Sequence, residues 1–254
     1  MCVTTEERWQ AQAASFGAVA DAYERGRPSY PAEAVGWLIP AGAAQVIDLG
    51  AGTGKLTRQL TGRGLDVTAV EPSEGMREKL RQAVPGVRAL EGTAERIPLP
   101  DGSVDAVLVA QAWHWMDPAR AVPEVARVLR PGGQLGLAWN VRDERADWVA
   151  GLGALLRRID GAHVSSTASD APQVGPPFGQ LERRDVGWVH HLSPGALVDM
   201  VSSRSYVSTM PPADREKLLN DLRDLMLTHP SLAGAGEIAL PYVTRCWRTR
   251  LPGP

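Results

Sequence analysis

The chain has 254 residues, and its 27 lysine and arginine residues against 29 aspartate and glutamate residues give a net charge of −2. A protein that follows a phosphate backbone carries a basic excess or patch, so this balance argues against a nucleic-acid partner. Two cysteines are too few for a disulfide framework or a zinc site. The first residues include Glu6 and Glu7 and no apolar core, so we do not expect a signal peptide. No run reaches about 18 apolar residues, so we do not expect a membrane-spanning helix. We therefore expect a single cytoplasmic domain without a membrane or metal partner, of unknown oligomeric state.

The first informative element along the chain is a short strand at residues 46–49, which read Val-Ile-Asp-Leu. This apolar, partly β-branched run is typical of a strand buried on both faces. Glycine then recurs at Gly50, Gly52 and Gly54, and a helical pattern starts near Thr53. Because glycine lacks a Cβ, the backbone can turn sharply and a ligand can lie against it. A strand, a glycine turn and a helix start predict a nucleotide-type site at the carboxyl end of a sheet.

The spacing of these glycines distinguishes cofactor classes. A dinucleotide fingerprint requires Gly-x-Gly-x-x-Gly, and Lys55 stands where its third glycine belongs. A phosphate-binding loop requires serine or threonine after Gly-Lys, and Leu56 stands there. The next predicted strand, residues 65–70, ends at Glu71, which is 21 residues after Gly50. That is about the separation at which an acidic side chain meets a ribose diol.

Alternating strands and helices further along predict an α/β protein with a parallel sheet and helices on both faces. An aspartate followed by proline at 117–118 predicts a helix start. We expect Pro123 to kink or delay this helix and residues 131–133, Pro-Gly-Gly, to end it. Further strands are expected at residues 87–91, 104–110, 134–140 and 238–247.

The later part of the chain predicts a loop and two helices. Residues 160–180 are rich in serine, alanine, proline and glycine with little periodicity, which predicts a flexible loop. Ser193 followed by Pro194 predicts a helix start. An apolar stripe predicts a helix that ends near Pro230. The stripe consists of Leu218, Leu219, Leu222, Leu225 and Met226.

Residues 46–54 resemble the first motif of the class I S-adenosylmethionine-dependent methyltransferases. Four further segments match in the same order, namely residues 67–76, 92–98, 104–115 and 126–133. The resemblance covers residues 12–140 well and the remainder loosely, and it is similar to the small-molecule branch that includes trans-aconitate methyltransferases. It implies a Rossmann-like, doubly wound, seven-stranded and mostly parallel sheet whose last strand is antiparallel, with a helical lid. It also implies S-adenosyl-L-methionine as cofactor and S-adenosyl-L-homocysteine as product.

The same resemblance divides the single domain 1–254 into parts. It implies an N-terminal helical cap at 1–36, a cofactor-binding core at 37–140, the flexible loop at 160–180 and a substrate lid at 192–236. It places the cofactor against the following residues: Tyr23, Arg27, Asp48, Gly50, Ala51, Gly52, Thr53, Gly54, Glu71, Pro72, Met76, Thr93, Ala94, Glu95, Gln111, Ala112 and Trp115.

Several of these residues have an alternative interpretation. Tyr23 and Arg27 would bind the methionine carboxylate, or would be a packed aromatic and a surface arginine. Asp48 would support the glycine loop or meet the methionine amine. Met76 would pack on the adenine or within its own helix, and residues 93–95 would bond the adenine amino edge.

An aromatic cluster, Trp113-His114-Trp115, follows the fourth predicted strand, where the family's acceptor pocket opens. Aromatic side chains there would hold a flat or apolar acceptor or enclose the sulfonium, although we expect one of the two tryptophans to be core. His114 is the candidate general base, and the alternative is a histidine packed between the two tryptophans. His163, His190 and His191 are interpreted as structural, while Arg204 and Tyr206 are candidates for an acceptor carboxylate.

The resulting hypothesis is in-line methyl transfer to an oxygen, or to a nitrogen or carbon, of a small-molecule acceptor. A cofactor-binding protein without catalysis would show the same glycine loop. An adenine-N6 nucleic-acid methyltransferase needs an Asp/Asn-Pro-Pro-aromatic loop after the fourth strand, where residues 111–115 stand instead. A nicotinamide enzyme is disfavoured by the glycine spacing.

Overall fold

The computed structural model describes residues 28–160, 171–204, 207 and 210–253. The chain divides into two compact units, each assembled from segments that are distant in sequence. The sheet unit contains residues 29–140, 171–186 and 244–253 of the described chain, and the helical unit contains the rest.

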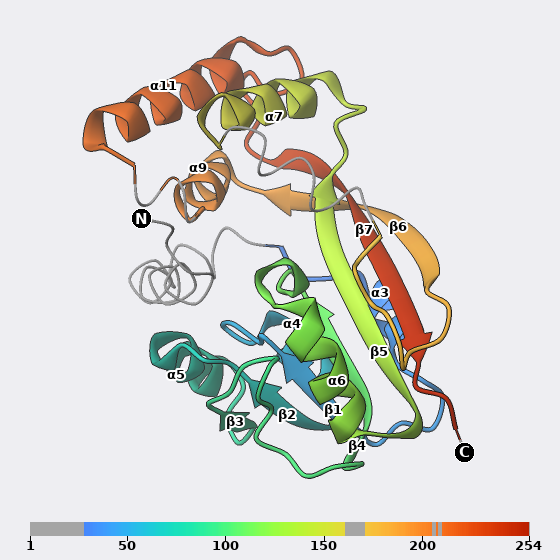
Figure 1. Cartoon of the computed structure of the whole chain (residues 1–254). Coiled ribbons are helices and arrows are strands. Elements are labelled where there is room, and N and C mark those ends of the chain that lie inside the picture. The colour runs from blue at the N-terminus through green and yellow to red at the C-terminus, as the bar shows by residue number, and fades with distance from the viewer. Residues whose placement is uncertain (1–27, 161–170, 205–206, 208–209, 254) are drawn as a thin grey trace. The chain divides into compact units, whose positions relative to one another are not determined.

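Within the described residues, seven strands form one sheet in the order β3-β2-β1-β4-β5-β7-β6 (Figure 1). β1 pairs in parallel with both β2 and β4, β2 pairs with β3, and β4 pairs with β5. Six strands are parallel and the last is antiparallel, which confirms the Rossmann-like α/β fold. The strands are β1 Gln45–Leu49, β2 Asp66–Val70, β3 Arg88–Leu90, β4 Val104–Ala110, β5 Leu129–Arg142, β6 Glu182–Leu192 and β7 Ile238–Arg250.

The order of the strands places a topological switch point at β1. The chain continues from β1 to β2 on one side of it and later returns to β4 on the other side. In open parallel sheets, ligands bind at the carboxyl ends of the strands at such a point. The glycine loop directly follows β1 and lies at this position.

The helices of the sheet unit are α3 Ala32–Leu38, α4 Lys55–Thr61, α5 Glu74–Ala83 and α6 Pro118–Val128, with a short 3-10 helix at Trp113–Trp115. Apolar side chains of the strands and helices form a common core, because strands covered on both faces bury nearly every side chain. Core members include Leu38, Val46, Leu60, Val67, Ala106, Leu108 and Cys246.

The start of α6 confirms the predicted cap, since Asp117 Oδ1 accepts a hydrogen bond from the Ala119 N–H at 3.0 Å. The predicted end was wrong. The helix continues through Pro123 and stops at Val128, and residues 131–133 belong to β5. Pairing between β4 and β5 jumps from Val104–Leu129 to Ala106–Gln134, so the Pro-Gly-Gly segment is an irregularity in a strand that begins five residues earlier than expected.

The helical unit contains α7 Asp147–Asp160, α9 Pro194–Ser202 and α11 Pro212–Thr228. Ser193 accepts from the Ala196 N–H at 3.2 Å, which confirms the second predicted cap. On α11, Leu218 and Leu222 of the predicted stripe are buried in the core of this unit, and the other three stripe residues pack against it. The sequence interpretation did not predict α7.

The division of the domain into cap, core, loop and lid stays a prediction. Residues 1–27 and 161–170 lie outside the described residues, and the described part of 192–236 belongs to the helical unit. No helix in the described part of the chain has the length and apolar character needed to cross a membrane.

Candidate functional site

The glycine loop after β1 has three residues in the left-handed region, with φ of 70° at Gly50, 55° at Gly52 and 88° at Gly54. Only glycine adopts this region without a steric cost. A Cβ on Gly50 would lie 2.8 Å from the Ala112 Cβ, so the loop after β4 packs directly on the glycine loop. A Cβ on Gly52 would meet no described atom within 4 Å beyond its chain neighbours. Among the described residues, the loop is therefore closed towards β4 and open above Gly52.

Glu71, at the end of β2, is 8% exposed and its carboxylate faces this loop. Its Oε2 accepts from the Gly52 N–H and its Oε1 from the Ser73 N–H, both at 3.0 Å. Burial raises the pKa of Glu71, although these two donors and Arg77 act in the opposite direction. Each carboxylate oxygen has about two lone pairs, so acceptor capacity for two ligand hydroxyls is left.

Arg77 of α5 is a site residue that the sequence interpretation missed. Its guanidinium is buried, and Nη1 donates to the backbone oxygens of Glu71 at 2.6 Å and Pro72 at 2.7 Å. Nη2 pairs with Glu74 and, at 3.0 Å, with Glu91. Arg77 therefore fixes the turn that carries the Glu71 side chain. The spacing of Glu74 and Arg77, three residues apart on one helix, was the available signal.

Asp48 is 1% exposed, and its Oδ2 accepts from the Thr57 hydroxyl at 2.5 Å. Burial raises the pKa of Asp48 to about 7, while hydrogen bonds from Thr57 lower it and the charge of Glu71 adds a smaller increase. This contact joins β1 to α4 across the glycine loop. It favours the supporting role for Asp48, and its contact with a cofactor amine stays a prediction.

The residues predicted near the adenine form a tight local structure. The Thr93 N–H donates to Arg96 O at 3.3 Å and the Arg96 N–H donates back at 3.2 Å, with Ala94 buried between them. Glu95 Oε1 accepts from the Asp117 N–H at 3.0 Å and so supports the start of α6. Met76 is buried on α5, in agreement with helix packing. Their adenine contacts stay predictions.

The loop after β4 begins with Gln111, whose φ of 59° is unusual for a residue other than glycine. Its backbone N–H donates to Ala138 O at 2.8 Å and its side-chain amide to Asn140 O at 3.2 Å. Both bonds anchor the loop to the end of β5. A residue other than glycine held in this region is typical of positions under functional constraint.

The three aromatic residues that follow have different surroundings. Trp113 is buried and belongs to the core, whereas Trp115 is half-buried. His114 is exposed, its ring lies 4.7 Å from that of Trp115, and its Nδ1 accepts from the Trp139 indole N–H at 3.3 Å. His114 thus contacts Trp115 of its own segment and Trp139 of β5.

Comparison with known proteins decides the family of this chain. A family model described as a methyltransferase domain matches residues 47–137. An uncharacterised methyltransferase of Mycobacterium tuberculosis is 58% identical over 237 residues, which cover 93% of this chain and 96% of that protein. The chain belongs to the class I S-adenosylmethionine-dependent methyltransferases. The matched residues include the glycine loop, Glu71 and the loop after β4.

Two further relatives of the methyltransferase are informative. A malonyl-[acyl-carrier protein] O-methyltransferase of Methylococcus capsulatus is 36% identical over 180 residues, which cover 65% of this chain and 62% of that protein. A putative type II methyltransferase from Anaeromyxobacter dehalogenans has a solved structure with a TM-score of 0.68 and 26% identity. That match covers 90% of this chain and 99% of the other.

The sheet unit of the methyltransferase brings together the predicted residues that follow β1, β2 and β4. Tyr23, Arg27, His163 and Tyr206 lie outside the described residues. The remaining predicted acceptor or structural residues belong to the helical unit, namely His190, His191 and Arg204.

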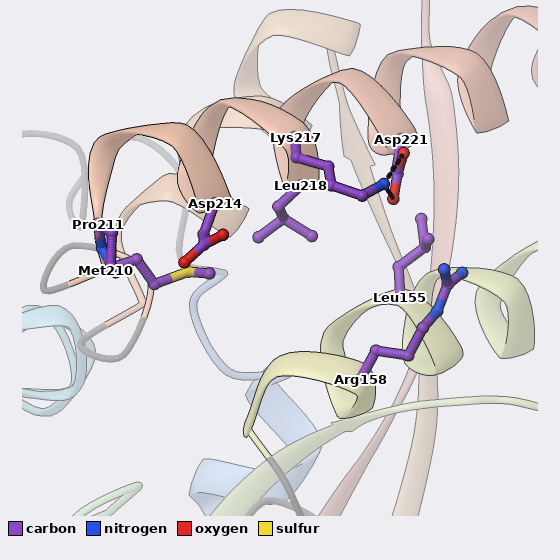
Figure 2. A pocket seen from close by; sticks show the side chains of 8 residues that line it. All are labelled: Leu155, Arg158, Met210, Pro211, Asp214, Lys217, Leu218 and Asp221. Carbon is purple, nitrogen blue, oxygen red and sulfur yellow. Dashed lines mark hydrogen bonds and ion pairs between the residues drawn. The ribbon is translucent and has the colours of Figure 1, made fainter.

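The helical unit contains a separate pocket of about 450 Å³ between α7 and α11 (Figure 2). Leu155 and Leu218 supply apolar lining, and Lys217 pairs with Asp221 at 3.3 Å. The described residues that line it are Leu155, Arg158, Met210, Pro211, Asp214, Lys217, Leu218 and Asp221. None of the predicted cofactor residues that the structure describes lines it.

Proposed function

We propose that this protein transfers a methyl group from S-adenosylmethionine to an oxygen of a small-molecule acceptor, with nitrogen or carbon as the other acceptor atoms. The open space above Gly52, directly beside the buried carboxylate of Glu71, carries this proposal. A ligand that lies against the loop there can present two hydroxyls to Glu71. The glycine spacing excludes the dinucleotide fingerprint for the same position.

The residues present fit this cofactor. Glu71 has lone pairs for the two ribose hydroxyls, and the backbone at Gly52 leaves room for close approach. Pro72, Met76 and residues 93–95 would border the adenine, while Gln111, Ala112 and Trp115 would border the methionine side. When bound, S-adenosylmethionine supplies a methyl group on an already activated sulfonium. The chain has to orient the acceptor in line with that methyl and exclude water, a proximity effect worth up to about 7–11 kcal/mol.

One feature supports oxygen as the acceptor atom, and another argues against a nucleic-acid acceptor. The Methylococcus relative is named as an O-methyltransferase. The net charge of −2 does not favour a nucleic-acid acceptor. We place the protein in a small-molecule branch similar to the trans-aconitate methyltransferases and in the cytoplasm. We also propose that residues 192–236 act as the acceptor-selecting lid, so that hydrogen exchange in this segment slows when S-adenosylhomocysteine binds.

Transfer of a radiolabelled methyl group tests the function. S-adenosylmethionine labelled in the methyl group is incubated with the protein and with separate small-molecule, nucleic-acid and protein fractions of a cell extract. We expect label in the small-molecule fraction with the wild type and strongly reduced label with Glu71→Ala. Label in the nucleic-acid fraction alone would contradict the proposed acceptor class. Saturable cofactor binding without label in any fraction would contradict the enzyme and favour a cofactor-binding protein.

A further inference from the structure

The contact between Trp139 and His114 has a fixed donor. Trp139 lies on β5, is 5% exposed, and packs edge-on against Trp247 with ring centroids 5.2 Å apart. The indole N–H can only donate a hydrogen bond. Its acceptor is Nδ1 of His114, at 3.3 Å. The ring that donates is therefore held by the core, whereas the ring that accepts lies on an exposed residue.

This contact determines which nitrogen of His114 carries a proton. A ring nitrogen that accepts a hydrogen bond has no proton, so a neutral His114 carries its proton on Nε2. An imidazolium would place a second N–H opposite the indole N–H, so the contact favours the neutral ring. Desolvation acts in the same direction and lowers the pKa of His114 to about 4. Because water still reaches the exposed side of the ring, the indole donor is the stronger of the two arguments.

The surroundings of His114 leave Nε2 available to a ligand. The ring lies beside Trp115 and Trp139, and no charged group of the described residues contributes to the pKa shift. No described residue forms a hydrogen bond with Nε2 in the structure. His114 lies two residues after Ala112, which packs on the glycine loop at Gly50. The Nε2–H of His114 therefore lies on the loop after β4, which borders the proposed cofactor site.

We propose that Trp139 is a positioning residue that holds His114 as a neutral imidazole whose Nε2–H donates a hydrogen bond to a lone-pair oxygen of the methyl acceptor. The acceptor contact rests on the proposed function. A general base needs an unprotonated nitrogen directed at the acceptor, and the only unprotonated nitrogen of His114 is occupied by the indole. His114 therefore orients the acceptor oxygen and does not remove a proton from it.

Nitrogen NMR of the full chain labelled on histidine tests the positioning step and requires neither cofactor nor acceptor. His114→Gln identifies the His114 signals among those of the five histidines. We expect an unprotonated Nδ1 and a protonated Nε2 from pH 8 down to about pH 5. Trp139→Phe keeps an aromatic ring but removes the N–H, so the preference for the Nε2–H tautomer should fall to the weaker one of a free histidine, and the pKa of His114 should rise because no indole N–H opposes the imidazolium.

Trp247→Phe is the matched control, because it removes an indole from the same cluster without touching His114. It should leave the His114 signals unchanged, and thermal unfolding of both variants checks that each is folded. A His114 that carries its proton on Nδ1, or that titrates between pH 6 and 7 in the wild type, would overturn the proposal.

Methyl transfer into the small-molecule fraction tests the acceptor contact. His114→Gln keeps a side-chain N–H donor and should stay within roughly tenfold of the wild-type rate, whereas His114→Phe should lose roughly tenfold to a hundredfold. A base role predicts that both variants lose at least about a hundredfold, which would overturn the donor role. Absence of transfer by the wild type would overturn the proposed function and the acceptor contact together, while the NMR result would still decide whether Trp139 fixes the tautomer.

Discussion

The backbone N–H of Gly52 donates to Oε2 of Glu71 across 3.0 Å, which joins the loop after β1 to the end of β2. The other carboxylate oxygen accepts from Ser73, and Arg77 holds the backbone of the same turn. One carboxylate therefore shapes the loop and keeps lone pairs for a ligand. A substitution at Glu71 should therefore change both the stability of the loop and the affinity for a ligand.

Gly52→Ala should weaken cofactor binding more than it weakens the fold. The new Cβ would occupy the open space above the loop, and the left-handed φ costs about 1–2 kcal/mol for a residue with a Cβ. Gly64→Ala is the matched control, because Gly64 has a φ of 78° and equally open surroundings away from the loop. Thermal unfolding should show similar losses for both variants. Calorimetry with S-adenosylhomocysteine should show at least about a tenfold loss for Gly52→Ala only, and equal affinities would argue against the site.

Glu71→Ala should reduce the affinity for S-adenosylhomocysteine by roughly tenfold to a thousandfold, because hydrogen bonds to a charged group are worth about 1.5–3 kcal/mol each. It should also reduce the free energy of unfolding, since the N–H groups of Gly52 and Ser73 lose their acceptor. Glu78→Ala, an exposed position on α5, is the control and should change neither quantity. An unchanged dissociation constant in folded Glu71→Ala would refute the ribose role.

The raised pKa of Asp48 predicts a pH-dependent stability. Its folded-state pKa is about 7, against 3.8 for the ordinary carboxyl group. Between these values the folded state holds a proton that the unfolded state has lost, so the free energy of unfolding falls as pH rises from about 4 to 7. The slope for one such proton is up to about 1.4 kcal/mol per pH unit, and it flattens above pH 7.

Urea unfolding of the wild type and Asp48→Asn at several pH values measures this contribution. Glu71 has a pKa raised in the same direction, so the difference between the two proteins isolates Asp48. The asparagine keeps an oxygen that can accept from Thr57. We expect a shallower decline for Asp48→Asn between pH 4 and 7. Parallel curves would mean that Asp48 is ionised in the folded protein throughout this range.

The sequence was sufficient to predict the elements whose signals are local. The buried strand before Gly50, the caps at Asp117 and Ser193, and the apolar stripe on α11 all depend on residues close together in the chain. These features confirm the fold, because strand and helix periodicities directly reflect which faces are buried. The order of the strands came from the family resemblance rather than from these patterns.

Contacts that depend on strand register were not predictable in the same way. Trp139 meets His114 only because β4 and β5 pair in one register, and residues 130–133 interrupt that pairing with an irregularity. Arg77 and Thr57 likewise act on residues at the ends of neighbouring strands. A single sequence indicates that such polar residues are unusual for their position, but not which backbone oxygen or carboxylate they reach.

Titration calorimetry of the whole chain with S-adenosylmethionine, S-adenosylhomocysteine and NAD tests most directly which cofactor the glycine loop binds. Lys55 in place of the third dinucleotide glycine and the open position at Gly52 predict saturable binding of the first two ligands at one site and no binding of NAD. Binding of NAD without binding of S-adenosylmethionine would contradict the cofactor, the role of Glu71 and the proposed methyl transfer together.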